Sequence, residues 1–267
     1  MLKDITLGQY FPGQTVIHRL DPRTKLILVV VYIIALFTAK SFVSYGLMLA
    51  FLLTVIAVAK IRLKIIAKSM KPLLLIIILT AVLNLFYSAG EPLVKFWIFT
   101  ITKEGILNAV YMVLRISLLV AGTFMLTYTT SPISLTDGLE SVLSPLKKLR
   151  VPVHELAMMM CIALRFIPSL ITETDKIMSA QKARGADFES GNLISRAKAM
   201  IPILVPLFIS SFRRADELAT AMECRCYHGG EGRTKLSPLH YAARDFLAFA
   251  VGALLLAAVI VLRRFGL

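Results

Sequence analysis

The sequence predicts an all-α membrane protein with about five transmembrane helices and a cytoplasmic domain of long amphipathic helices. Hydrophobic residues make up 57% of the 267 residues, against about 45–50% in soluble proteins, and the mean hydropathy is +0.76. Charged residues account for only 17%, against about 25% in soluble proteins. A soluble fold of this composition would expose too much apolar surface, so lipid must form part of the solvent. The composition excludes an ordinary cytosolic enzyme, a disordered chain and a disulfide-stapled secreted module.

Five apolar stretches have the length of a membrane span. A bilayer core needs about 20 such residues, or fewer where flanking side chains reach the interface. The stretches lie at 24–39, 42–59, 72–88, 105–129 and 243–262. Between 131 and 241, charges of both signs return together with an amphipathic helical periodicity. We therefore expect an N-terminal membrane domain at 1–130, a cytoplasmic domain of helices at 131–241 and a C-terminal transmembrane helix at 242–267.

The positive charge of the chain indicates its orientation in the membrane. The net charge is +14, from 30 Lys and Arg against 16 Asp and Glu, and an excess of basic residues retains loops in the cytoplasm beside anionic lipid. The linker at 60–71 holds five basic residues. We therefore expect a multi-pass protein of the plasma membrane with the N-terminus and residues 131–241 in the cytoplasm and the C-terminus outside. Arg263 and Arg264, at the outer end of the last span, oppose this rule.

Two long helical rods are predicted within 131–241. The first runs from Glu155 to Lys182, and the second from about Leu193 to Cys226. In the first rod, apolar or small residues recur at spacings of four and three, which is typical of helices that pack side by side; they are Leu156, Met160, Ala163, Ile167, Leu170, Thr174 and Ile177. The corresponding stripe of the second rod is Ala197, Ile201, Leu204, Phe208, Ala215 and Met222.

Prolines inside both rods predict kinks, because proline removes a backbone donor and its ring clashes with the preceding turn. Pro168 lies in the first rod, and Pro202 and Pro206 lie in the second. We regard these three residues as candidate hinges at which the rods bend or slide.

An arginine stands at the end of each rod. The first rod ends in Ala183-Arg184-Gly185 and the second in Cys224-Arg225-Cys226. A guanidinium stays charged and offers five rigid donors, so two rods that end alike favour a docking role on another protein. The alternative is that each arginine only complements the negative end of its helix dipole.

The sequence lacks the motifs that mark nucleotide-binding, proton-relay and metal-binding sites. No glycine is followed by lysine, so there is no phosphate-binding loop, and we do not expect the chain to hydrolyse ATP or to be an enzyme. The apolar spans hold no paired carboxylates for a proton relay. Cys224, Cys226 and His228 alternate near a helix end, a spacing that gives poor tetrahedral geometry without a fourth ligand. We therefore expect no catalytic residue, no metal site and no cofactor in this chain.

Arg115 is a charge inside the fourth apolar stretch. A charged side chain there is costly and usually faces protein or water, and the stretch at 105–129 contains no acidic residue to pair with it. Two alternatives account for a charge at this position. Arg115 contacts another subunit, or its side chain extends to the edge of the membrane. Together with the basic linker at 60–71, Arg115 also motivates a different function, an autonomous membrane enzyme or carrier that acts on lipid or an anionic metabolite.

Several stretches occur in an order that is typical of one known family. They are Gly8-Gln9-Tyr10-x-Pro12-Gly13, His18-Arg19-Leu20-Asp21-Pro22-Arg23-Thr24-Lys25, Ala163-Leu164-Arg165-Phe166-Ile167-Pro168 and Ala180-Gln181-Lys182-Ala183-Arg184-Gly185. On these residues, over nearly its whole length, the chain resembles the transmembrane T-component (EcfT/CbiQ family) of energy-coupling-factor (ECF) transporters. The last stretch holds the first of the family's two Ala-Arg-Gly signatures. In the second signature, Cys224 and Cys226 replace alanine and glycine, while Arg225 remains.

The resemblance implies a non-catalytic coupling subunit of an ECF-type ABC importer for a vitamin or micronutrient. It implies three further partners: two cytoplasmic ABC-type ATPases, which bind ATP and Mg, and a membrane S-component, which captures the substrate. Ala183, Arg184, Gly185 and Arg225 would contact the ATPases. Nucleic acid is not expected as a partner, because the charged stretches lack interleaved aromatic side chains.

Overall fold

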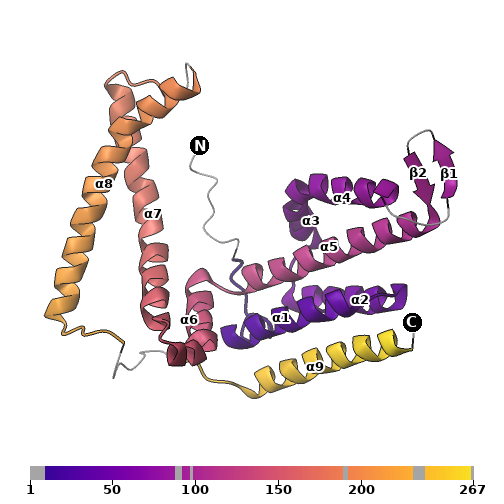
Figure 1. Ribbon diagram of the computed structural model, residues 1–267. Coiled ribbons are helices and arrows are strands. Elements are labelled where there is room, and N and C mark those ends of the chain that lie inside the picture. The colour runs from indigo at the N-terminus through magenta and orange to yellow at the C-terminus, as the bar shows by residue number, and fades with distance from the viewer. Residues whose placement is uncertain (1–9, 88–91, 97–98, 189–191, 231–237, 266–267) are drawn as a thin grey trace. The chain divides into compact units, whose positions relative to one another are not determined.

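The computed structural model describes residues 10–87, 92–96, 99–188, 192–230 and 238–265. These residues form helices and one short antiparallel hairpin (Figure 1), and the predicted helical fold class with five candidate membrane spans is confirmed. The elements are α1 (Pro22–Thr38), α2 (Phe42–Ala59), α3 (Leu63–Met70), η2 (Lys71–Leu73), α4 (Leu74–Tyr87), β1 (Pro92–Phe96), β2 (Phe99–Thr102), α5 (Lys103–Thr129), α6 (Pro132–Leu143), η3 (Ser144–Leu149), α7 (Val153–Ala183), α8 (Leu193–Cys224) and α9 (Ala243–Arg264).

The hairpin of β1 and β2 was not anticipated from the sequence. Val94 pairs with Ile101, and Phe96 pairs with Phe99. β-branched and aromatic residues favour strands, but the segment is too short to reveal a strand period between two apolar helices.

The described chain divides into two compact units. The first, here called the membrane unit, extends to Ser141 and resumes at Leu239, and the second, here called the rod unit, runs from Val142 to Pro238. The domain boundaries expected from the sequence, after 130 and after 241, refer to a membrane surface and stay a prediction.

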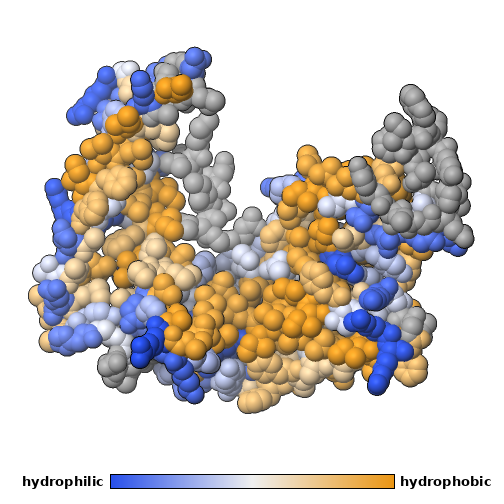
Figure 2. Space-filling model, in the orientation of Figure 1, coloured by the Kyte–Doolittle hydropathy of each residue, from blue (hydrophilic) through white to orange (hydrophobic). Residues whose placement is uncertain are grey.

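In the membrane unit, α1, α2, α5 and α9 pack around a common core. Its fully buried large side chains include Tyr45, Met48, Tyr128 and Val259, which come from α2, α5 and α9. Leu36 supplies the equivalent position on α1. Many other apolar side chains on these helices point outward, and Figure 2 shows the apolar surface that they form. A surface of this kind needs lipid or a partner protein to cover it.

A close contact between α1 and α5 depends on a glycine. A Cβ atom at Gly122 would overlap the ring of Tyr32. The Tyr32 hydroxyl donates a hydrogen bond of 3.1 Å to the carbonyl oxygen of Leu118, one turn before Gly122. The missing side chain therefore lets the ring of a buried tyrosine approach α5 closely and its hydroxyl reach the backbone.

Five segments of described helix are long and apolar enough to cross a membrane, as predicted, but they are not the predicted five. They are Phe42–Ala59, Leu63–Phe86, Lys103–Thr129, Val153–Ala183 and Ala243–Arg264. The first predicted span appears as α1, whose 17 residues lie at the lower end of the spanning range. The helix α7 qualifies because its first half is almost uncharged, while its charges gather in the second half.

In the rod unit, α7 and α8 pack as an antiparallel pair (Figure 1). Ser169 of α7 contacts Arg214 of α8, and Glu173, one turn later on α7, contacts Ser210, one turn earlier on α8. The two helices therefore run in opposite directions where they touch.

The packing face of α8 differs from the predicted stripe. Ile201, Leu204 and Phe208 are 44–62% exposed, so this stripe does not form the contact with α7, and that prediction is wrong. The side chain of Ala197 lies outside the described residues. The less exposed face carries Ile203, Leu207, Ser210 and Arg214. Apolar residues occur on several faces of α8, and the polar contacts with α7 select one of them.

The three candidate hinge prolines lie inside continuous helices. Pro168 is an interior residue of α7, and Pro202 and Pro206 are interior residues of α8. Each removes one backbone donor from its helix. Their role as hinges stays a prediction.

The contact at Gly122 leads to a stability prediction. Gly122→Ala should lower the free energy of unfolding by about 1–3 kcal/mol, because the added methyl group forces Tyr32 out of its site. A thermal melt of the purified chain measures the effect. Gly46→Ala is the matched control, since its Cβ would meet no atom within 4 Å. An equal melting temperature for the two variants would contradict this account of the α1–α5 contact.

Candidate functional site

The C-terminus of α7 is closed by a left-handed cap. Arg184 is the capping residue, and Gly185 follows with φ +88°. The amide of Gly185 donates to the carbonyl oxygen of Lys182, and the amide of Ala186 donates to that of Gln181, both at 3.0 Å. This pair of bonds is the Schellman motif, which satisfies the last carbonyl groups of a helix.

The C-terminus of α8 repeats the same geometry without a glycine. Arg225 is the capping residue, and Cys226 adopts the left-handed conformation with φ +57°. The amide of Cys226 donates to Glu223 at 2.8 Å, and the amide of Tyr227 donates to Met222 at 3.1 Å. The departure of Cys226 from the glycine of the family signature therefore leaves the cap in place.

The two capping arginines lie at opposite ends of the rod unit. Arg184 and Arg225 are both exposed, and the ends of α7 and α8 that carry them point in opposite directions (Figure 1). Arg184 lies eleven residues beyond Glu173, and Arg225 lies eleven residues beyond Arg214. Each tip is thus about 16 Å from the contact between the helices, at about 1.5 Å per residue. The pair has an approximate two-fold arrangement.

A polar cluster holds the two rods together between these tips. Glu173 accepts hydrogen bonds from the hydroxyl of Ser210 and from the guanidinium of Arg214, and Arg214 also donates to the hydroxyl of Ser169. All four side chains are half-buried. This cluster was not predicted from the sequence. Its signal was present as two pairs of polar residues, each pair four residues apart.

Arg115 has a partner within the membrane unit. Its Nε atom donates a hydrogen bond of 2.9 Å to the hydroxyl of Tyr45 on α2. Its guanidinium carbon also lies 5.7 Å from the centre of the Phe37 ring. An aromatic face and a phenol oxygen stabilise a cation away from water, so the side chain has a structural role between α1, α2 and α5.

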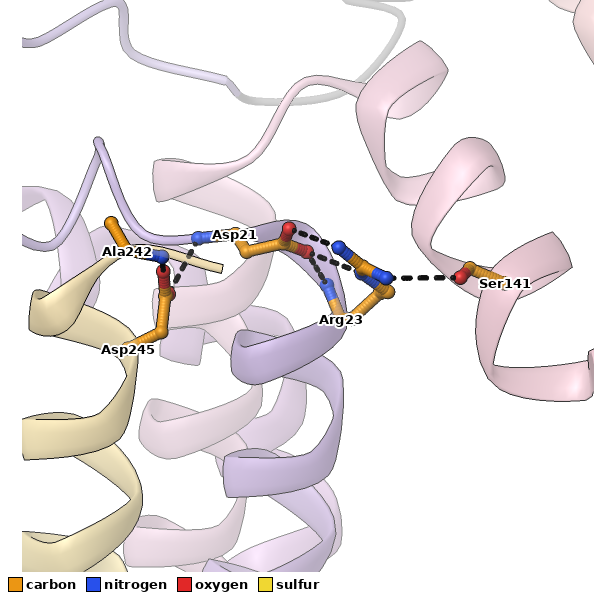
Figure 3. Close-up of polar contacts among 5 residues, drawn as sticks. All are labelled: Asp21, Arg23, Ser141, Ala242 and Asp245. Atoms are coloured by element: carbon orange, nitrogen blue, oxygen red, sulfur yellow. Dashed lines mark hydrogen bonds and ion pairs between the residues drawn. The ribbon is translucent and has the colours of Figure 1, made fainter. Parts of the chain in front are cut away.

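The stretch from His18 to Lys25 forms a clasp at the start of α1. Asp21 caps the helix by accepting from the amide of Arg23 at 2.8 Å, and its carboxylate pairs with the Arg23 guanidinium at 2.9 Å. Figure 3 shows Arg23 between Asp21 and Ser141, with 3.4 Å to the serine hydroxyl. Asp245 accepts from the amides of Asp21 at 2.9 Å and Ala242 at 2.8 Å. The clasp therefore joins the starts of α1 and α9 to α6.

Burial and charge set the pKa values around this clasp. Burial raises the pKa of Asp21, but hydrogen bonds from Arg23 outweigh it, so the pKa is lowered overall. Burial, together with the nearby charge of Lys25, lowers the pKa of His18. Asp21 is therefore ionised and His18 is neutral at neutral pH.

Gly8 and Gln9, which precede this stretch in the family pattern, lie outside the described residues.

The cysteines near the end of α8 form no cluster of ligands. Cys224 and Cys226 are exposed and unbonded thiols. Within the described residues, no three His, Cys, Asp or Glu side chains come together in a way that would hold a metal ion.

Comparison with known proteins decides the family. The sequence matches the family described as cobalt transport protein, CbiQ, over residues 13–236. It is 54% identical to the energy-coupling factor transporter transmembrane protein EcfT of Clostridium kluyveri, over 99% of this chain and 98% of that protein. The chain belongs to the EcfT/CbiQ family.

Other EcfT proteins are similar over almost the same length. The protein of Acidaminococcus fermentans is 57% identical over 92% of each chain, and that of Thermosediminibacter oceani is 52% identical over 95% of this chain and 96% of its own. The chain is therefore a multi-pass transmembrane component of an ECF transporter and has a role in transport.

The two caps lead to opposite predictions. Gly185→Ala should destabilise the last turn of α7 by about 1 kcal/mol, because only glycine adopts φ +88° without a steric cost. Cys226→Gly should stabilise the last turn of α8 by a similar amount. Hydrogen exchange of the two turns measures this, with a change of about fivefold in opposite directions. Faster exchange in both variants would contradict the shared cap.

Proposed function

We propose that this chain is the non-catalytic coupling subunit of an ECF-type ABC importer that takes up a vitamin or micronutrient. In this role it links two cytoplasmic ATPases to a substrate-binding S-component in the plasma membrane. One observation carries the proposal: two helices with the same cap present an exposed arginine at opposite ends of one antiparallel pair.

The spacing of the tips supports two separate docking sites. Along the rod axis, Arg184 and Arg225 are about 33 Å apart, from 22 helical residues at about 1.5 Å each. A single groove does not span that distance, whereas two ATPase subunits side by side offer one groove to each tip. The guanidinium fits such a groove because it binds carboxylates and backbone carbonyl groups through a rigid set of donors. The small flanking residues Ala183 and Gly185 allow close approach at the first tip.

ATP and Mg belong to the ATPases in this proposal, and this chain contributes no cofactor. The motion of the two ATPases would move the two tips relative to each other. The cluster at Glu173 and Arg214 joins the rods about two-thirds of the way along each helix, so a displacement of one tip shifts the whole pair. Pro168, Pro202 and Pro206 are the proposed points at which the rods bend.

The exposed apolar surface of the rods supports a partner in the membrane. Phe208 and Phe212 stack on each other on α8 and are 62% and 67% exposed. Aromatic side chains of this kind need a cover, which we assign to the S-component. The tips face the cytoplasm in this arrangement, together with the N-terminus, and the C-terminus lies outside.

Charge reversal at the tips tests the proposal. The double variant Arg184→Glu/Arg225→Glu should lose the ATPases on co-purification or hydrolyse ATP without uptake. A wrong charge at a docked interface costs about 2–5 kcal/mol, which is a loss of affinity of at least about 30-fold. Arg213→Glu, on an exposed residue of α8 away from the tip, is the matched control.

Two results would overturn the proposal. One is normal assembly and uptake in the double variant. The other is transport or turnover by the purified chain without ATPases, which would support an autonomous carrier or enzyme instead.

A further inference from the structure

The membrane unit contains a cavity that the proposed coupling role does not use. It has a volume of about 380 Å³ and lies among α1, α2, α5 and α9. Most of its wall is aliphatic or aromatic, from side chains such as Leu28, Phe51, Met125 and Val251. Two cationic residues, Lys25 and Arg244, line the same end of it, at the starts of α1 and α9.

The depth of the cavity suits a hydrocarbon chain. Its wall on α9 extends from Arg244 to Leu255, which is about 16 Å at 1.5 Å per residue. That is about half the thickness of the hydrocarbon core of a bilayer, which is about 30 Å. An acyl chain of one leaflet therefore fits along it, with its polar end at the two cations.

The buried cation at this end makes its hydrogen bonds to neutral groups. The ammonium group of Lys25 donates to the carbonyl oxygens of Thr129 at 2.8 Å and His18 at 3.1 Å, and to the hydroxyl of Thr130 at 3.2 Å. These three contacts satisfy its donors, and the nearby carboxylates of Asp245 and Asp21 interact with its positive charge. The free cation at this end of the cavity is therefore the other one.

The second cation is available to a ligand. Arg244 is exposed, and within the described part of the chain no hydrogen bond or ion pair engages its side chain. The neighbouring carboxylates are already engaged: Asp245 binds the backbone amides of Asp21 and Ala242, and Asp21 pairs with Arg23. A positive charge at the mouth of an apolar cavity selects an amphipathic anion.

We propose that this cavity binds one anionic phospholipid, with an acyl chain along the apolar wall and the phosphate against Arg244. The lipid fills the space between α1 and α9 and fixes the polar ends of both helices at the same depth in the membrane. The binding site lies wholly within the membrane unit, so it does not depend on the ATPases or on the proposed coupling role.

Native mass spectrometry of the full chain tests this site. The chain is purified in a mild detergent and given equal amounts of phosphatidylglycerol and phosphatidylcholine with the same acyl chains. We expect one phosphatidylglycerol molecule to be retained, with a preference of about tenfold over phosphatidylcholine. Arg244→Gln should reduce that preference at least fivefold. The matched control is Arg264→Gln, an exposed arginine at the other end of α9, which should leave it unchanged.

A second pair of variants tests the cavity itself. Val251→Trp narrows the apolar wall and should reduce retention of both lipids, whereas Val261→Trp, on a similarly exposed valine of α9 outside the cavity, should not. Melting temperatures of the variants verify that each remains folded. Equal retention of the two lipids, equal effects of the two arginine variants, or equal effects of the two valine variants would each overturn the proposal. So would displacement of the lipid by glycerol phosphate at equal concentration, because it would assign the affinity to the phosphate alone.

Discussion

The antiparallel contact of α7 and α8 at Glu173 and Arg214 is the constraint on which the rest of the rod unit depends. Each carboxylate oxygen of Glu173 accepts a hydrogen bond from α8, one from the hydroxyl of Ser210 and the other from the guanidinium of Arg214. This fixes both the register and the direction of the helices. Because each helix continues eleven residues beyond the contact before its capping arginine, the contact also fixes where the two tips lie. A parallel pair with the same sequences would place both arginines at one end.

The membrane unit is organised by a different kind of contact. Its helices pack through apolar side chains and through close approaches at Gly122 and Gly252, which fix no polar ends by themselves. The clasp of Asp21, Arg23 and Asp245 supplies that missing constraint, because it joins the first residues of α1 and α9 across most of the sequence. The signature stretch at the start of the chain thus has a structural role, and the cavity beside it is the place where lipid would complete the packing.

The sequence predicted the elements better than their contacts. Helix positions and the arginine at each rod end follow from local signals, namely apolar periodicity, proline and glycine. The packing face of α8 did not, because Phe208 and Ile203 are both apolar and only the partner helix distinguishes them. The partner of Arg115 was also beyond sequence reasoning, since Tyr45 lies 70 residues away. Cys226 stands where the family signature has glycine, and the hydrogen bonds of the motif hold that residue in the left-handed region.

The distance between the two rod tips tests the central claim most directly. Spin labels on Ala183→Cys and on the native Cys224, in a chain that also carries Cys161→Ala and Cys226→Gly, report it by pulsed electron paramagnetic resonance. The labelled residues each lie ten residues beyond the contact, so the antiparallel pair predicts a separation along the rod axis of about 30 Å at 1.5 Å per residue, in the full chain and in the assembled transporter. A separation near 10 Å, the spacing of adjacent helix axes, would place both arginines at one end and contradict the account.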